Sequence, residues 1–313
     1  MSCDLADRPL KSLSTLIGGS DCSYFIPTLT PRLRVFSCRG CGFTSIQSWA
    51  FFGLHDIDTI HLEGNAIKGT QLPIYQPISL CLITKIILLD NQLAKIDKYS
   101  FAGLSNLKIL GLENCGILHI DKMAFYGLNH VDRFVLSNNI LTKIEPDAFQ
   151  NVSQIDQMSF NHMEATELQP YSLRGIRDIN LLSFTHSNIR KLKPYSFLGI
   201  NNITTINFHS SQVSTISPRA FVGIGKVSVI KFKSTQISTL KCDALVGVDC
   251  VRSIHWDDSP IRCDCHMQWL IEMRANISAD LTKGLACASP YTLSGQEIHE
   301  LNRDSLQCND EER

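Results

Sequence analysis

The residues with the clearest chemical potential are the twelve cysteines of this 313-residue chain, because most of them lie near its two ends. The group near the start is Cys3, Cys22, Cys38 and Cys41, and the group near the end is Cys242, Cys250, Cys263, Cys265, Cys287 and Cys308. Only Cys81 and Cys115 lie between these two groups. Cysteines gathered at both ends favour disulfides that pin a long structure, and disulfides persist in oxidising compartments. The sequence therefore predicts an extracellular protein.

A zinc site is the main alternative for the segment Cys263-Asp264-Cys265-His266. Paired zinc-binding cysteines are usually separated by two to four residues, and this segment does not have that spacing. No other paired metal-ligand motif occurs in the sequence. We therefore expect no metal and no cofactor.

Catalysis is not expected either. A hydrolase or transferase needs a nucleophile, a base and an orienting group within reach of each other in a pocket. The sequence contains no nucleophile-elbow motif and no phosphate-cradling glycine loop. Its glycines recur at a regular interval that indicates turn geometry: Gly103, Gly127, Gly175, Gly199, Gly223 and Gly247. The chain is predicted not to be an enzyme.

The composition limits the class of protein and its partners. Apolar residues make up 44% of the chain and charged residues 19%, which favours a packed chain over a disordered one. The formal net charge of −1 gives the whole molecule no attraction for polyanions, so nucleic acid is not an expected partner.

The chain shows no signal peptide and no membrane span. Met1–Asp21 lacks the apolar run of about 7 to 15 residues that a leader requires. The longest apolar stretch, Leu80–Leu89, is interrupted by Lys85 and is far shorter than a span of about 20 residues. We expect a missing leader, no membrane insertion, and a protein that is secreted or is the ectodomain of a truncated membrane protein. Asn-x-Ser/Thr triplets predict glycosylation at Asn151, Asn202 and Asn276.

The elements that must position these residues come from an internal repeat. Ile179–Ile189 shows the unit, with apolar residues at positions 1, 4, 6 and 11 and a small polar residue at position 9. Successive units start 24 residues apart, except for one step of 26 between Ile57 and Ile83. The ten starts are Leu33, Ile57, Ile83, Leu107, Val131, Ile155, Ile179, Ile203, Val227 and Val251. A fixed period of this length predicts a solenoid.

A second half-motif, such as Ala124-Phe125-Tyr126-Gly127-Leu128, keeps the same interval, and only the 26-residue unit lacks it. Together the two half-motifs resemble the leucine-rich repeat family in its extracellular 24-residue form. The resemblance implies an α/β fold, a right-handed horseshoe-shaped solenoid with a parallel β-sheet on its concave face and disulfide-bonded caps. It assigns residues 1–32 to an atypical N-terminal cysteine cap, 33–261 to ten repeats, and 262–313 to a cysteine-rich C-terminal flanking domain with an acidic tail.

Two positions of the repeat are expected to build the interior. Position 9 of the family is an asparagine that bonds the backbone of the turn after the strand, and Asn65, Asn91 and Asn139 match it. Met163 at this position cannot donate a hydrogen bond, and small substitutes occupy it in five other repeats: Cys115, Ser187, Ser211, Thr235 and Ser259. Position 6 changes from leucine to an aromatic series, which we interpret as a packed spine: Phe160, Phe184, Phe208, Phe232 and Trp256.

The resemblance also implies a disulfide pairing in the C-terminal domain, Cys263 with Cys287 and Cys265 with Cys308. Four cysteines alone allow three connectivities. We further expect Cys22 to pair with Cys38 and Cys242 with Cys250. Cys81 and Cys115 are expected to be buried thiols.

A solenoid usually acts through its concave sheet, where positions 2, 3, 5, 7 and 8 form columns. His162, His186 and His209 stand one repeat apart, so they are candidates to lose affinity for a partner, or to bind a metal, as the pH crosses about 6.5. The alternative is that they are solvated polar residues. The full candidate set adds Asn138, Asn161, Lys231, Lys233 and Asp257.

The expected function is an extracellular module that binds a protein ligand or cell-surface receptor through the concave face, in adhesion, guidance or innate immune recognition. One alternative is a matrix component that binds collagen or glycans. A second alternative, an intracellular scaffold, is disfavoured by the cysteines and the glycosylation triplets.

Overall fold

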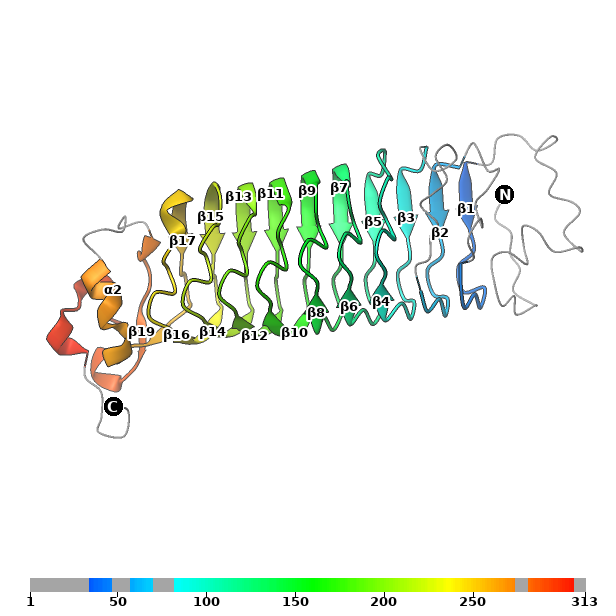
Figure 1. Ribbon diagram of the computed structural model, residues 1–313. Helices are drawn as coiled ribbons and strands as arrows, with labels where there is room; N and C mark the ends of the chain where they lie inside the picture. The colour runs from blue at the N-terminus through cyan, green and yellow to red at the C-terminus, as the bar shows by residue number, and fades with distance from the viewer. Residues whose placement is uncertain (1–33, 47–56, 70–81, 274–280, 307–313) are drawn as a thin grey trace, which may run out of the picture. The chain divides into compact units, whose positions relative to one another are not determined.

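The computed structural model describes residues 34–46, 57–69, 82–273 and 281–306. The chain divides into two compact units, Met1–Ser159 and Phe160–Arg313. In each unit the chain coils, and successive coils pair through parallel strands (Figure 1). The predicted solenoid with disulfide-bonded ends is confirmed.

The main sheet of the first unit follows the chain order. Its strands are β1 (Val35–Ser37), β2 (Thr59–His61), β3 (Lys85–Ile87), β5 (Ile109–Gly111), β7 (Asn129–Val135) and β9 (Val152–Ser159). Lys85 pairs with Ile109, 24 residues on, whereas Thr59 pairs with Lys85, 26 residues on. The repeat in the sequence is therefore the physical step from one coil to the next. The return segments form a smaller parallel sheet of β4 (Lys95–Ile96), β6 (His119–Ile120) and β8 (Lys143–Ile144).

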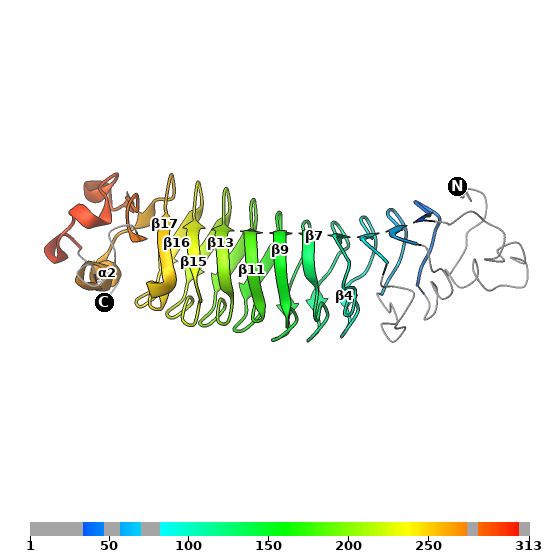
Figure 2. The same ribbon diagram turned by 90° about the horizontal axis from the view of Figure 1, so that it is seen from above.

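The second unit repeats this plan. Its main-sheet strands are β11 (Ile176–Ser183), β13 (Asn201–Asn207), β15 (Val227–Lys231) and β17 (Val251–His255). Its return sheet consists of β10 (Glu164–Leu168), β12 (Asn188–Leu192), β14 (Gln212–Ile216) and β16 (Gln236–Leu240). Figure 2 shows the main-sheet strands following one another in a row. In the described part of the chain the only α-helix is α2 (Gln268–Met273), so the return segments contribute turns and strands to the solenoid.

The interior of each coil is filled by positions 1, 4 and 6. In one coil these are Ile179, Leu182 and Phe184, all buried. The aromatic series at position 6 forms the predicted spine in the second unit. Consecutive ring centroids lie 5.2, 5.0, 5.0 and 4.8 Å apart from Phe160 to Trp256. Since this distance matches the spacing of paired strands, each ring stacks on the ring at the same position of the next coil.

The second half-motif turns the chain back toward the main sheet. Phe125 stacks between Phe101 and Phe149 at 5.5 and 5.3 Å. The glycine of the motif has a positive φ, 77° at Gly127, where an L side chain is strained. Asn151 occupies the glycine position with φ 59°, which asparagine tolerates better than most residues.

Position 9 forms a ladder of buried hydrogen bonds in the first unit. The Asn139 amide donates to the carbonyls of Leu136 in its own coil and Leu112 in the preceding coil, at 2.8 and 2.9 Å. Its oxygen accepts from the backbone N–H groups of Cys115 and Ile117. One asparagine therefore ties the turn of its own coil and also joins that coil to its neighbour.

In the second unit serine and threonine replace this asparagine, and their side chains are shorter. The Ser187 hydroxyl donates to the Phe160 carbonyl of the preceding coil at 2.9 Å and accepts from the Met163 N–H. The same bond to the preceding coil joins Ser211 to Phe184 and Thr235 to Phe208. These hydroxyls preserve the link between coils.

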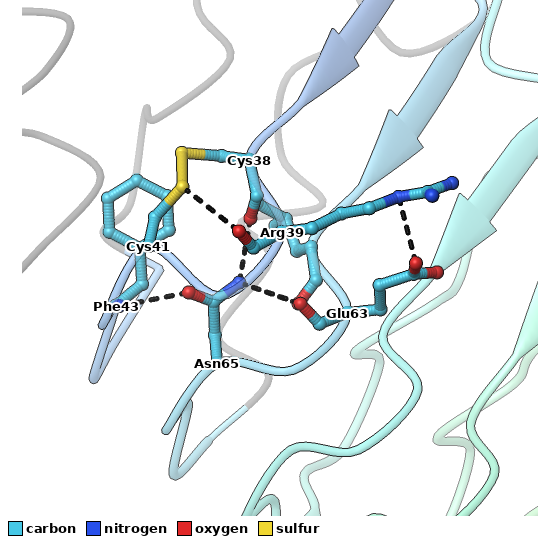
Figure 3. Close-up of a disulfide and its surroundings, with 7 residues drawn as sticks. Cys38, Arg39, Cys41, Phe43, Glu63 and Asn65 are labelled. Atoms are coloured by element: carbon cyan, nitrogen blue, oxygen red, sulfur yellow. Dashed lines mark hydrogen bonds and ion pairs between the residues drawn. A yellow bond between two sulfur atoms is a disulfide. The ribbon is translucent and has the colours of Figure 1, made fainter. Parts of the chain in front are cut away.

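The first described coil uses a disulfide where the later coils use asparagine. Cys38 and Cys41 are bonded, with their Cα atoms 5.7 Å apart, and they occupy positions 6 and 9 of their repeat (Figure 3). The Asn65 amide of the next coil donates to the Cys38 carbonyl at 2.8 Å. The expected bond from Cys38 to Cys22 is therefore wrong, because Cys38 is already bonded to Cys41; Cys22 lies outside the described residues.

The C-terminal segment covers the last coil. Cys263 is bonded to Cys287, the pairing that the resemblance implies, next to the two-stranded sheet of β18 (Ile261–Arg262) and β19 (Cys287–Ser289). Cys265 is also disulfide-bonded, but its expected partner Cys308 lies outside the described residues. The Trp256 indole N–H donates to the Leu281 carbonyl at 2.8 Å, which ties the end of the aromatic spine to this segment. Short 3-10 helices complete it: η2 (Cys265–Met267), η4 (Tyr291–Leu293), η5 (Ile298–Glu300) and η6 (Arg303–Ser305).

The expected Cys242–Cys250 disulfide is wrong, since both cysteines are free and exposed. Cys242 follows β16 of the return sheet, whereas Cys250 ends the 3-10 helix η1 (Val248–Cys250) directly before β17 of the main sheet. The segment between them crosses from one sheet to the other, so their closeness in sequence does not bring them together.

The remaining described thiol, Cys115, is buried at position 9, and this burial raises its pKa to about 12. Alkylation needs the thiolate, which is therefore nearly absent at pH 8. We expect iodoacetamide to modify Cys242 and Cys250 in the native protein and Cys115 only after unfolding in urea. Peptide mass spectrometry measures this, and equal modification of all three thiols in native conditions would contradict the burial of Cys115.

Candidate functional site

The candidate partner-binding residues lie along the main sheets and at their carboxyl edges. Asn138, His162 and His186 are at position 8, which was expected to form a column on the concave sheet. The structure places them in the turn after each strand, with φ of 56°, 53° and 55°. Asn138 belongs to the first unit, and the other candidates belong to the second. Positions 3 and 5 therefore supply the outward face of the sheet, and positions 7 and 8 follow each strand at its carboxyl edge.

The outward face of the first unit carries paired charges. Arg39 Nε lies 2.8 Å from Glu63 Oε1, and Arg34 Nε lies 3.5 Å from Asp58 Oδ2 (Figure 3 shows the first pair). The pKa of His61 is lowered, first by burial and then by the charges of Lys85 and Arg39. Two arginines of this face, Arg34 and Arg39, are thus paired with carboxylates of the neighbouring coil.

The outward face of the second unit is different, because a neutral hydrogen-bond network occupies its centre. The Ser183 hydroxyl and the Thr185 backbone N–H both donate to Asn161 Oδ1, at 2.7 and 2.9 Å. Asn207 Nδ2 donates to Thr185 Oγ1 at 3.4 Å. These side chains come from neighbouring coils, so the network, which includes the buried Ser183, holds the half-buried Asn161, Thr185 and Asn207 in a fixed arrangement.

The three predicted histidines do come together beside this network. The rings of His162 and His186 stack with centroids 5.0 Å apart and planes 6° apart, and His209 meets His186 edge-on at 6.1 Å. His209 Nδ1 lies 3.2 Å from the Lys233 carbonyl, so this nitrogen is the donor, and Nε2 lies 3.2 Å from the Ser210 hydroxyl. Among the described residues, none of the three rings is part of an ion pair.

The last two coils contribute the charged end of the face. Lys231 on β15 pairs in register with Asn207 on one side and His255 on the other. Lys233 follows β15 and is exposed, and Asp257 follows β17 and is exposed. Within the described part of the chain, neither lysine forms an ion pair.

Sequence reasoning missed the residues that organise the face, namely Ser183, Thr185 and Asn207. Their signal was available, because hydroxyl and amide side chains recur at positions 5 and 7 of neighbouring repeats. A column of such residues in register predicts hydrogen bonds from coil to coil.

The return sheets are a weaker candidate surface, since several of their charges are paired. In the first unit Lys95 Nζ lies 2.7 Å from Asp121 Oδ2, and hydrogen bonds from this lysine to Asp121 and Asp97 raise its pKa. In the second unit the hydrogen bond from Lys193 lowers the pKa of Glu167.

The predicted glycosylation sites that the structure describes mark the opposite edge of the main sheets. Asn151 directly precedes β9 and Asn202 lies at the start of β13, and both are exposed. Asn202 Nδ2 donates to Asp178 Oδ1 at 2.6 Å, a bond that needs only one of its two amide hydrogens. Asn276 lies outside the described residues.

Two further observations concern the described residues only. They contain no group of three or more histidine, cysteine or acidic side chains arranged to hold a metal ion. No helix formed by them has the length and apolar character required to cross a bilayer.

Comparisons with known structures show the same fold. A chain of the octameric complex of Latrophilin 3, Unc5D and FLRT2 (LRR) matches with a TM-score of 0.55 and 17% identity, over 91% of this chain and 94% of that one. The TLR13–ssRNA13 complex matches with a TM-score of 0.58 and 15% identity, over 84% of this chain and 40% of that one. The Drosophila Toll–Spatzle complex matches with a TM-score of 0.53 and 18% identity, over 89% of this chain and 39% of that one.

Sequence comparisons identify the repeat. The human leucine-rich repeat LGI family member 4 is 34% identical over 50 residues, which is 16% of this chain and 9% of that protein. The match thus spans less than a tenth of its length. The model of the BspA type leucine-rich repeat region matches in six copies, over residues 40–140, 77–185 and 118–250, which is more than half of the chain. The chain therefore belongs to the leucine-rich repeat family, of the BspA type.

Proposed function

We propose that this protein is an extracellular module that binds a protein partner through the main-sheet face of its second unit, in adhesion, guidance or innate immune recognition. The observation that carries the proposal is the preset polar network of Asn161, Ser183, Thr185 and Asn207 beside three histidines that form no ion pair in the described part of the chain. A partner can exchange hydrogen bonds with such a surface without first breaking ion pairs.

Several features support an extracellular location and this choice of face. Disulfides are present at both ends of the described repeats. Glycans on Asn151 and Asn202 would occupy the amino edge of the main sheets and leave the outward face and the carboxyl edge open. Two of the solved structures with this fold are complexes with other proteins, one with Latrophilin 3 and Unc5D and the other with Spatzle.

Leucine-rich repeat proteins are typically interaction modules, and we propose no enzymatic activity for this chain. One similar structure contains single-stranded RNA. At positions 2, 3, 5, 7 and 8 of the described second unit, however, the only lysines and arginines are Lys231, Lys233 and Arg252. Asp257 and Asp258 occur at the same positions of the last repeat. Nucleic-acid binding draws most of its free energy from many lysine and arginine contacts, so we retain a protein as the proposed partner.

Thr205→Arg tests the proposed face. Thr205 lies on β13 and is paired with Leu181 and Val229, so a bulky side chain there obstructs the middle of the face. We expect binding to a partner from a panel of cell-surface ectodomains to weaken at least about tenfold, which corresponds to about 1.4 kcal/mol. Surface plasmon resonance measures it.

Thr215→Arg is the matched control, because Thr215 belongs to the same coil and is similarly half-buried but lies on β14 of the return sheet. We expect this variant to bind like the wild type. Greater loss with Thr215→Arg than with Thr205→Arg would place the interface on the return sheet. Hits confined to collagen or a glycan array would favour the matrix alternative, and absence of glycans and disulfides in the cell-derived protein would favour the scaffold alternative.

A further inference from the structure

We propose that the main-sheet face of the second unit captures a carboxylate-rich polypeptide segment and holds it more tightly at about pH 5.5 than at about pH 7.5. This inference rests on the proposed function and adds to it the chemistry of the partner and the direction of regulation.

The first observation is the distribution of charge. From Asn161 to Ser234, positions 2, 3, 5, 7 and 8 of the repeats carry no carboxylate. The permanent cations in this range are Lys231 and Lys233, and the groups that gain charge on acidification are His162, His186 and His209. Imidazoles change charge between about pH 5 and 8, so this range of the face changes from two positive charges toward five as the pH falls.

The second observation is the packing of the rings. His162 and His186 stack at 5.0 Å, so two protonated rings repel each other. No ion pair with a described carboxylate offsets this repulsion. An external carboxylate beside the rings removes it, and therefore proton uptake and anion binding must strengthen each other.

The charged groups on the surrounding elements do not supply that carboxylate. Asp178 on β11 accepts a hydrogen bond from Asn202 at the amino edge of the sheet, away from position 8. The others on the strands of the second unit and in its last coil are Glu164 and Glu167 on β10, Arg177 on β11, Arg190 and Lys191 on β12, Lys231 on β15, Lys233 after it, and Arg252, His255, Asp257 and Asp258. None of these groups forms an ion pair with the three histidine rings in the described structure.

The neutral network beside the histidines favours a polypeptide over a denser polyanion. The half-buried side chains of Asn161, Thr185 and Asn207 offer amide and hydroxyl groups that match peptide N–H and C=O groups, and the buried Ser183 helps to hold Asn161 in place. Asp257 and Asp258 repel a highly charged chain at the far end of the face. A sequence with spaced carboxylates fits both features.

The test uses the full chain and poly-L-aspartate, which is ionised at both pH values. Binding is measured by biolayer interferometry at constant ionic strength. We expect the wild type to bind at least about tenfold more tightly at pH 5.5 than at pH 7.5. His162→Gln/His186→Gln/His209→Gln should reduce this ratio below about threefold.

The matched control is His130→Gln, because His130 is exposed but lies in the first unit, at the start of β7. It should keep the wild-type ratio. A wild-type ratio near one, or an undiminished ratio in the triple variant, would overturn the inference. A larger gain at pH 5.5 for heparin or single-stranded RNA than for poly-L-aspartate would overturn the choice of partner chemistry. These outcomes leave the proposed function standing, because the comparison of Thr205→Arg with Thr215→Arg is made at pH 7.5.

Discussion

Asn139→Ala is expected to lower the free energy of unfolding of the first unit by about 3–5 kcal/mol. Asn139 is 1% exposed, and its side chain satisfies two backbone carbonyls and two backbone N–H groups of the interior. Alanine leaves these groups buried without partners, and each such group costs about 1–3 kcal/mol when the loss is complete. Because the coils relax partially, the total loss of unfolding free energy stays below the sum of the costs of the four groups.

Two variants separate this mechanism from general damage. Asn139→Ser should cost roughly half as much, because the serines of the second unit keep the bond to the preceding coil. Asn138→Gly, one residue away, should be nearly neutral, since Gly40 and Gly64 adopt a positive φ at the same position. Hydrogen–deuterium exchange in urea reports the first unit separately. A similar loss of stability in Asn139→Ala and Asn138→Gly would refute the ladder as its source.

The sequence allowed the interior to be predicted residue by residue, because in a solenoid one position meets the same position of the next coil. Position 9 was expected to bond the turn, and the side chains of Asn139 and Ser187 donate to the Ser137 and Thr185 carbonyls of that turn. Position 6 was expected to form a spine, and Phe184 and Phe208 stack in it. Both inferences needed only the period and the residue type.

The edge of the sheet and part of the disulfide pattern were harder to predict. Position 8 is rich in Gly, Asn and Asp, as at Gly64, Asn114 and Asp258, which is a signal of left-handed backbone. His162 and His186 occupy the same position but are neither Gly, Asn nor Asp, so they made this signal less clear. Cys242 and Cys250 were paired because they are close in sequence, but whether they meet depends on how the return segment crosses between sheets, which the repeat pattern does not specify.

Phe208→Ala should destabilise the second unit by about 3–5 kcal/mol, the cost of removing a fully buried aromatic side chain and leaving a cavity. The ring lies 5.0 Å from both Phe184 and Phe232, so two stacking contacts are lost together. Because Phe232 in turn stacks on Trp256, which is bonded to the C-terminal segment, the loss should also loosen that segment.

Phe208→Leu is the informative comparison. In the first unit leucine fills position 6 completely, as at Leu88, Leu112 and Leu136, all fully buried. Leucine at 208 should therefore cost only about 1–2 kcal/mol, since most of the cavity stays filled and only the ring contacts are lost. Urea denaturation followed by tryptophan fluorescence, with hydrogen–deuterium exchange across β13 and β15, measures both variants. If the two substitutions proved equally costly, ring stacking would be the main source of stability in the second unit; if both proved neutral, the aromatic spine would have no structural role.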